Sequence, residues 1–141
     1  MAISQRWRLR GTVSDGYTGQ EARTLLVHRL DWASNETWFE DGQGQLLSVI
    51  TNGERAVVAL LDHARDPGEH LVDPKSKGDS GGYAMSNGQI DTYLNRDTVP
   101  FPVACRAVAH FIEHGLWPHD VAVEDDRSSG SRRPASARDC R

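Results

Sequence analysis

Apolar residues recur with the period of an α-helix in two stretches of the chain. The first stretch covers residues 18–30 and opens with Thr18 and Glu21, which have the spacing of a capping box. The apolar positions that follow share one helical face: Ala22, Leu25, Leu26 and Leu30. The pattern predicts an amphipathic helix, followed by a loop with aromatic residues over 31–44.

The second helical stretch covers residues 99–115. Pro100 and Pro102 mark its start and Gly115 its end, because proline fits the first helical turn and glycine tolerates the left-handed conformation that follows a helix. One face collects the apolar residues Phe101, Ala104, Val108, Phe111 and Ile112. We therefore expect a second helix that packs on a core.

Between these helices the pattern is typical of β-strands and contains two strong hairpin signals. In each hairpin, strand-like segments flank an Asn-Gly pair: 45–51 and 55–62 around Asn52-Gly53, then 81–86 and 89–94 around Asn87-Gly88. In the last segment one face carries Ile90, Thr92 and Leu94, and the other carries Asp91 and Tyr93. We expect the face with Asp91 and Tyr93 to point outward.

The order of the elements indicates an α+β fold, in which two helices pack on an antiparallel meander with two Asn-Gly hairpins. Two shorter strands are predicted over 68–73 and 120–125. We expect a single domain over residues 1–126, with a poorly defined segment over 1–17. Residues 127–141 have almost nothing to bury, so we expect a disordered basic tail.

Length and cysteine content agree with one domain in a reducing compartment. A chain of 141 residues fits one domain. Cys105 and Cys140 are far apart and do not form a disulfide framework, which suits the cytoplasm. We see no signal-peptide pattern and no apolar run of membrane-spanning length, so we expect a cytoplasmic protein without membrane contact.

The net charge of −4 is unevenly distributed. Residues 1–127 hold 12 Lys or Arg and 19 Asp or Glu, a net charge of −7, whereas residues 128–141 hold four Arg and one Asp, a net charge of +3. An acidic body disfavours direct binding to nucleic acid and favours attraction to a basic partner. A mildly acidic surface that serves only solubility is an equally good explanation.

Two short motifs are similar to catalytic signatures. Residues 78–82 read GDSGG, the string around the nucleophilic serine of trypsin-like proteases. The histidines upstream of Ser80 do not have the sequence setting of the protease base, and the chain is too short for the two barrels of that fold. We interpret the motif as a glycine-rich turn.

The second motif is H-x-x-E-H, formed by His110, Glu113 and His114. Helix geometry places these side chains about 120–160° from the centre of the apolar face, which predicts a solvated polar face. A third zinc ligand would have to come from His119 or Glu124. We expect no catalytic residue, no metal and no cofactor.

A series of markers runs in order from Gly53 to Asp126. It comprises GERAVVALLD, the glycine pair of GDSGGY, the stretch NGQIDTYLNRDTVPFPVACRAVAHFIEHGLWP and the closing VAVED. With these markers the stretch resembles immunity proteins of bacterial polymorphic toxin systems, of the kind encoded beside toxins with a nucleic-acid deaminase domain. The resemblance covers about half of the chain, and Val123 stands where the family often has tryptophan.

The resemblance implies an inhibitor without catalysis, which binds its cognate toxin one to one and covers the active site. A deaminase toxin is expected to have a basic cleft with a zinc-activated water. The toxin-binding candidates are acids and aromatic residues: Glu69, Asp73, Asp79, Tyr83, Asp91 and Tyr93, with Trp38, Phe39 and Trp117 as anchor candidates. We expect no direct contact with nucleic acid.

Two alternatives remain open at this point. The first is an interaction module of another pathway that shares only the fold. The second is a small hydrolase that uses Ser80 or the pair His110 and His114.

Overall fold

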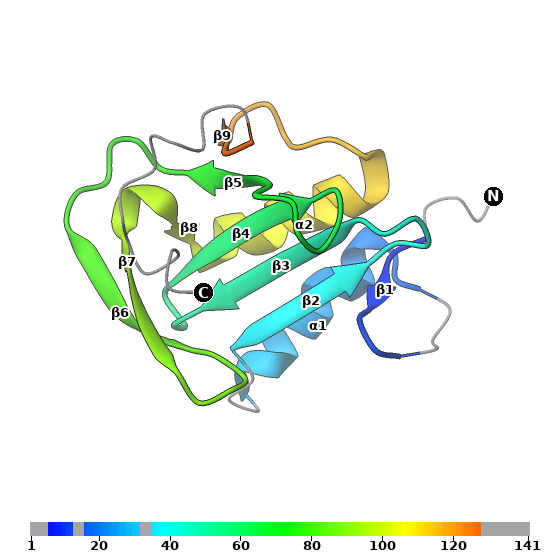
Figure 1. Cartoon of the computed structure of the whole chain (residues 1–141), viewed down its shortest axis with the longest axis horizontal. Helices are drawn as coiled ribbons and strands as arrows, with labels where there is room; N and C mark the ends of the chain where they lie inside the picture. Colours follow the sequence, from blue (N-terminus) through cyan, green and yellow to red (C-terminus); the bar gives the residue numbers. More distant parts are fainter. Residues whose placement is uncertain (1–5, 13–15, 32–34, 128–141) are drawn as a thin grey trace.

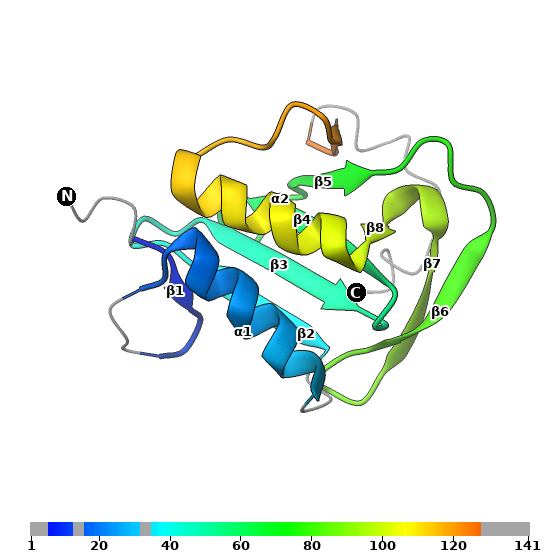
Figure 2. The same cartoon turned by 180° about the vertical axis from the view of Figure 1, so that it is seen from behind.

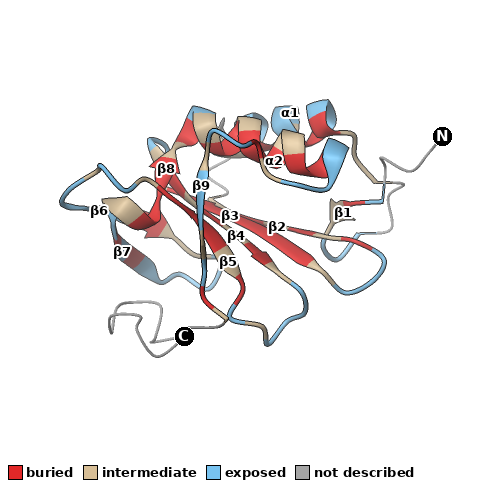
Figure 3. Cartoon of the chain, turned by 90° about the horizontal axis from the view of Figure 1, so that it is seen from above, coloured by how far each residue is buried: buried red, intermediate tan, exposed pale blue. Residues whose placement is uncertain are grey.

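The computed structural model describes residues 6–12, 16–31 and 35–127. Helices α1 (Gly19–Asp31) and α2 (Phe101–His114) lie side by side on one face of an antiparallel sheet (Figure 1, Figure 2). Figure 3 shows the two layers edge-on, with the buried residues concentrated between the helices and the sheet. The α+β fold predicted from the sequence is therefore confirmed.

The main sheet has the strand order β1-β2-β3-β4-β5-β9, and β8 pairs with β4. The bounds of its strands are β1 Arg8–Leu9, β2 Glu36–Glu40, β3 Leu46–Thr51, β4 Arg55–Leu61, β5 Glu69–Val72, β8 Val99–Pro100 and β9 Ala122–Asp125. A separate two-stranded sheet is made by β6 Asp79–Ala84 and β7 Ile90–Leu94, and the 3-10 turn η2 Asn95–Asp97 follows it. All of these strand pairs are antiparallel.

Alternation along the strands divides the sheet into two different faces. One face packs against the helices, where it contributes Phe39, Leu47, Val49, Val58 and Leu71 to the core. The helices contribute the predicted apolar positions to the same core: Ala22 and Leu26 from α1, and Phe101, Ala104, Val108, Phe111 and Ile112 from α2. Among the described residues no helix packs on the opposite face, which borders the cleft described below.

The ends of both helices form as the sequence indicates. The backbone nitrogen of Glu21 donates to Thr18 Oγ1 over 3.1 Å, and the Thr18 nitrogen donates to Glu21 Oε1 over 2.9 Å, which completes the capping box. Gly115 ends α2 with a positive φ of 78°, and its nitrogen donates to the carbonyl of Phe111.

The prediction of an aromatic loop over 31–44 is wrong for the central part of this segment, because residues 36–40 form strand β2. Thr37 and Phe39 point into the protein, while Glu36, Trp38 and Glu40 are only partly buried. This alternation over five residues is a strand pattern.

The ends of the folded body also differ from the prediction. Trp7, in the segment that we expected to be poorly defined, is 1% exposed and packs edge-on against Phe111 at 6.1 Å between ring centroids. At the other end Asp126 is buried, and Arg127, the first residue of the predicted tail, forms ion pairs with the body. The rest of the predicted tail, including Cys140, lies outside the described residues.

The β6–β7 hairpin has the opposite orientation to the one predicted. Tyr83 and Tyr93 face the main sheet and pack edge-to-face at 5.0 Å, whereas Ile90 is 68% exposed and Leu94 is 42% exposed. The tyrosine rings form a small second core with Ile50 because they have more apolar area to bury than the residues on the outer face.

No helix in the part of the chain that the structure describes has the length and apolar character needed to cross a membrane.

Candidate functional site

The open face of the sheet forms the floor of a cleft of about 930 Å³. Strands β2 to β5 supply this floor, the loop around Arg65 and Pro67 borders it, and the inner face of the β6–β7 hairpin forms a wall. Figure 1 looks onto this face, with the helices behind the sheet and the hairpin turn beside the start of β2. Its volume lies near the upper end of the usual range for ligand sites.

Glu36 and Asp91 line the hairpin end of the cleft. Glu36 Oε1 accepts a hydrogen bond from the backbone nitrogen of Ser86 over 2.7 Å, and its Oε2 accepts one from the indole nitrogen of Trp38 over 2.7 Å. Burial of Glu36 raises the pKa of its carboxyl, but the hydrogen bonds from Ser86 and Trp38 outweigh burial and lower the pKa overall. Glu36 is therefore a carboxylate at neutral pH.

Asp91 is 8% exposed and has similar surroundings. Its Oδ1 accepts from the side-chain amide of Gln89 over 2.7 Å, and its Oδ2 accepts from the hydroxyl of Tyr93 over 3.1 Å. The hydrogen-bond donors to Asp91, like those to Glu36, are neutral groups.

The other end of the cleft contains a buried histidine between two carboxylates. Nδ1 of His70 lies 2.8 Å from Asp126 Oδ2, and Nε2 lies 3.0 Å from Asp97 Oδ1. Burial lowers the pKa of His70, but the hydrogen bond to Asp97 and the charge of Asp126 raise it by more. This arrangement favours a doubly protonated imidazolium, which donates to both carboxylates.

The same end offers a set of ligand atoms that could hold a metal ion. Ligand atoms of His70, Asp97 and Glu124 lie within 4.8 Å of one another. However, the Arg96 guanidinium already lies there, with one nitrogen 3.1 Å from Asp97 Oδ1 and 3.3 Å from Glu124 Oε1. A metal ion would have to displace Arg96, so we interpret the set as an ion-pair network.

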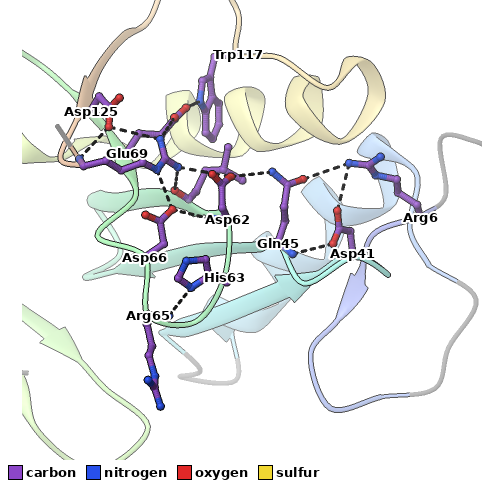
Figure 4. Close-up of polar contacts among 12 residues, drawn as sticks. Arg6, Asp41, Gln45, Asp62, His63, Arg65, Asp66, Glu69, Trp117 and Asp125 are labelled. Carbon is purple, nitrogen blue, oxygen red and sulfur yellow. Dashed lines mark hydrogen bonds and ion pairs between the residues drawn. The ribbon is translucent and has the colours of Figure 1, made fainter.

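A second cluster of charges surrounds Arg127 beside the cleft. The nitrogens of its guanidinium group lie within 4.0 Å of carboxylates from four residues: Asp62, Asp66, Glu69 and Asp125. Figure 4 shows these four acidic side chains gathered around one point, with the Trp117 indole beside Glu69. The Glu69 hydrogen bond contributes most to raising the pKa of Arg127, while burial opposes it. Four acids around one cation leave this surface strongly negative.

Three of the predicted toxin-binding residues meet at the cleft: Trp38, Asp91 and Tyr93. The Tyr93 ring faces inward, and it is mostly covered by the hairpin and sheet.

Four other predicted residues lie away from the cleft lining. Glu69 Oε2 accepts from the Trp117 indole over 2.8 Å, and Trp117 also packs on the core. Asp73 pairs with Arg55 over 2.7 Å, and Asp79 is exposed at the start of β6.

Two predicted contact residues are not accessible to a partner. Phe39 is 0% exposed because it points from β2 into the main core. Tyr83 is 0% exposed because the hairpin folds its inner face onto the sheet, where the Tyr83 hydroxyl lies 2.8 Å from Ser80 Oγ. Both predictions are therefore corrected.

Most of the charge in the cleft is carried by residues that are not among those predicted from the sequence, namely Glu36, His70, Asp97 and Asp126. Glu36 lies in the segment predicted to be a loop, so its position on a strand was not expected. Asp97 and Asp126 are 27 and 56 residues from His70 along the chain, so no local spacing indicates that they meet.

Neither catalytic motif is assembled within the described residues. Ser80 Oγ donates to Asn95 Oδ1 over 2.8 Å and contacts the Tyr83 hydroxyl, and no hydrogen bond joins it to a described histidine. In the second motif, His110 Nδ1 lies 3.0 Å from the Leu116 carbonyl. Glu113 accepts from the Gly19 nitrogen over 2.6 Å, so it joins α2 to the first turn of α1.

Comparison of the chain with family models, with curated proteins and with solved structures gives no match.

Proposed function

We propose that this protein is an immunity protein, which binds a cognate toxin one to one and blocks the toxin's active site. The toxin would act on nucleic acid, with deamination as the expected chemistry, and the complex would form in the cytoplasm. On this proposal the protein is not an enzyme and needs no cofactor.

The observation that best supports the proposal is the open face of the sheet. A cleft of about 930 Å³ runs over it, lined by carboxylates at both ends and bordered by the four acids around Arg127. The first 127 residues carry a net charge of −7. A domain that binds nucleic acid presents a basic surface, and an acidic surface of this kind is complementary to it.

The physical basis of inhibition is competition for the same basic groove. Carboxylates on this protein take the places that phosphates of the nucleic acid would occupy, while a segment of the toxin inserts into the cleft. A specific complex of standard size would bury about 1,600 Å² in total, which is enough to cover a nucleic-acid groove.

The proposal implies that a toxin gene lies beside this gene, and co-expression with the product of that neighbouring gene tests it. We expect the cells to survive and the two proteins to elute together as a one-to-one complex on size-exclusion chromatography. A mixture that elutes as two separate proteins, in cells that are not protected, would overturn the proposal. A neighbouring toxin with a different cytoplasmic substrate would change the expected chemistry but not the mode of inhibition.

A further inference from the structure

We propose that the hairpin end of the cleft binds an arginine side chain presented by a partner protein, between the carboxylates of Glu36 and Asp91 and beside the Trp38 ring. The inference rests on the proposed function only for the identity of that partner. The chemistry of the site is argued from this chain alone.

The first argument is the balance of charge along the cleft. Elsewhere in the lining each carboxylate lies close to a cation: Asp66 to Arg127, Asp97 to Arg96 and His70, and Asp126 to His70. Among the described residues, no ion pair within 4.0 Å joins a cation to the carboxylate of Glu36 or Asp91. The Arg29 guanidinium donates to the backbone carbonyl of Glu36, over 3.2 Å, and not to its carboxylate. The hairpin end is therefore the part of the cleft whose negative charge is not balanced within the described chain.

The second argument is that both carboxylates are held in fixed positions. Glu36 is fixed by Ser86 and Trp38, and Asp91 by Gln89 and Tyr93, through hydrogen bonds of 2.7–3.1 Å. A carboxylate has about four lone-pair directions. Glu36 accepts from the nitrogen and the side chain of Ser86 and from Trp38, and Asp91 accepts from Gln89 and Tyr93, so each carboxylate can accept at least one further bond. A partner's cation would therefore meet acceptors that are already oriented, which lowers the entropy lost on binding.

The third argument concerns the kind of cation. A guanidinium is planar, carries five donors and stacks on aromatic rings, whereas an ammonium is a compact, strongly hydrated point charge. The guanidinium carbon of Arg10 lies 6.0 Å from the centroid of the Trp38 ring, so this ring already contacts one guanidinium. The charge of Arg10 is paired with that of Glu40, at 4.0 Å. Two fixed carboxylates next to an indole favour arginine over lysine.

A short peptide provides a test that does not need the toxin. The probe is acetyl-Gly-Arg-Gly-Arg-Gly-amide, titrated into the ¹⁵N-labelled protein at low ionic strength. The control peptide carries citrulline, which has nearly the shape of arginine but no charge. We expect saturable shifts at the Trp38 indole and the Gln89 side-chain amide, with at least about tenfold weaker binding of the citrulline peptide. Equal binding of both peptides, or shifts confined to other surfaces, would refute the site.

Matched variants separate the site from general electrostatic attraction. The double variant E36Q/D91N removes both charges and keeps side chains that can accept hydrogen bonds, and E36Q alone serves if the double variant does not fold. The control E54Q/D79N removes the same number of charges from exposed positions outside the cleft lining. We expect about tenfold weaker peptide binding for the cleft variant and less than a twofold change for the control. Equal losses in the two proteins would contradict the inference.

The same variants distinguish this inference from the proposed function. If the arginine peptide does not bind and the toxin binds E36Q/D91N as tightly as it binds the wild type, the arginine site is wrong and the immunity function stands. If the toxin does not bind the wild type but the arginine peptide does, the immunity function is wrong and the site stands.

Discussion

His70 is held at both ring nitrogens in the cleft. Its two ring nitrogens bond to carboxylates from η2 and from the segment after β9, so the protonated ring joins three separate parts of the chain. Replacing His70 by glutamine leaves a neutral group between Asp97 and Asp126. We expect this change to lower the free energy of unfolding by about 3 kcal/mol at pH 6, measured by urea denaturation.

The stability should also depend on pH in a defined direction. The pKa of His70 is raised in the folded protein, against about 6.5 in an unfolded chain. The folded state therefore binds the proton more tightly, and this stabilisation is complete below about pH 6.5. It is lost as the pH rises through the folded-state pKa. We expect the stability difference between wild type and His70→Gln to shrink between pH 6 and 9, and a constant difference would contradict the assignment.

If the protein is the inhibitor that we propose, the residues of the two catalytic motifs should be dispensable for inhibition. Ser80 bonds to Asn95 and Tyr83, and His110 bonds to a backbone carbonyl. We expect Ser80→Ala and His110→Ala to protect cells from the toxin as well as the wild type does, with or without a chelator in the inhibition assay. Loss of protection by a folded Ser80→Ala protein would favour the hydrolase alternative.

At the scale of single residues, the sequence located part of the site. Trp38 and Asp91 were chosen as an aromatic residue and an acid, and both line the cleft. Phe39 was chosen for the same reason but faces the core, because neighbouring residues of a strand point to opposite sides. To tell that Trp38 faces the cleft and Phe39 faces the core, one must know that residues 36–40 form a strand, whereas the sequence pattern predicts a loop there.

The two helices approach each other closely at Gly19, the first residue of α1. A Cβ at this position would collide with the Ala109 carbonyl oxygen and lie 2.6 Å from Glu113 Cγ. We expect Gly19→Ala to lower the free energy of unfolding by about 1–3 kcal/mol in thermal or urea denaturation.

Gly42 provides the matched control for this prediction. A Cβ at Gly42 meets nothing within 4 Å, and its φ lies outside the left-handed region. We expect Gly42→Ala to change stability by less than about 0.5 kcal/mol. Similar losses for the two variants would show that the close contact between the helices is not the cause.

The secondary-structure elements were predictable where the signal was local. Both helices have caps and one apolar face, so their bounds follow from short-range patterns. The orientation of the β6–β7 hairpin is different, because it depends on which face finds a surface to cover. The tyrosines of the hairpin pack against Ile50 of β3, and Ile90 is left exposed, a result that no local pattern determines.

The negative charge of residues 1–127 should control the rate of association with a basic toxin. A net charge of −7 over residues 1–127 attracts a basic partner over distances of about one Debye length, near 10 Å at 0.1 M salt. We expect the association rate constant to fall about tenfold between 0.05 and 0.5 M NaCl in stopped-flow measurements.

The dissociation rate constant should change much less over the same range of salt. The contacts that hold the formed complex are short-range and partly desolvated, so salt screens them weakly. An association rate constant that does not depend on salt would contradict electrostatic steering, although it would leave a complex formed by other contacts intact.

At the scale of the whole molecule, the sequence predicted the two layers but not the cleft. The cleft exists because the helices cover one face of the sheet while the hairpin and the loop around Pro67 rise beside the other. Its charged residues come from β2, the loop between β4 and β5, β5, β7, η2 and the segment after β9. Only the folded arrangement shows that these segments meet.

The most direct test of the central claim is a titration of the activity of the proposed toxin, the product of the neighbouring gene, with this protein. The toxin is held at a concentration well above the dissociation constant, and its action on nucleic acid is followed as the protein is added. We predict a linear fall to zero activity at one equivalent. Full toxin activity in the presence of a large excess of folded protein would contradict the account.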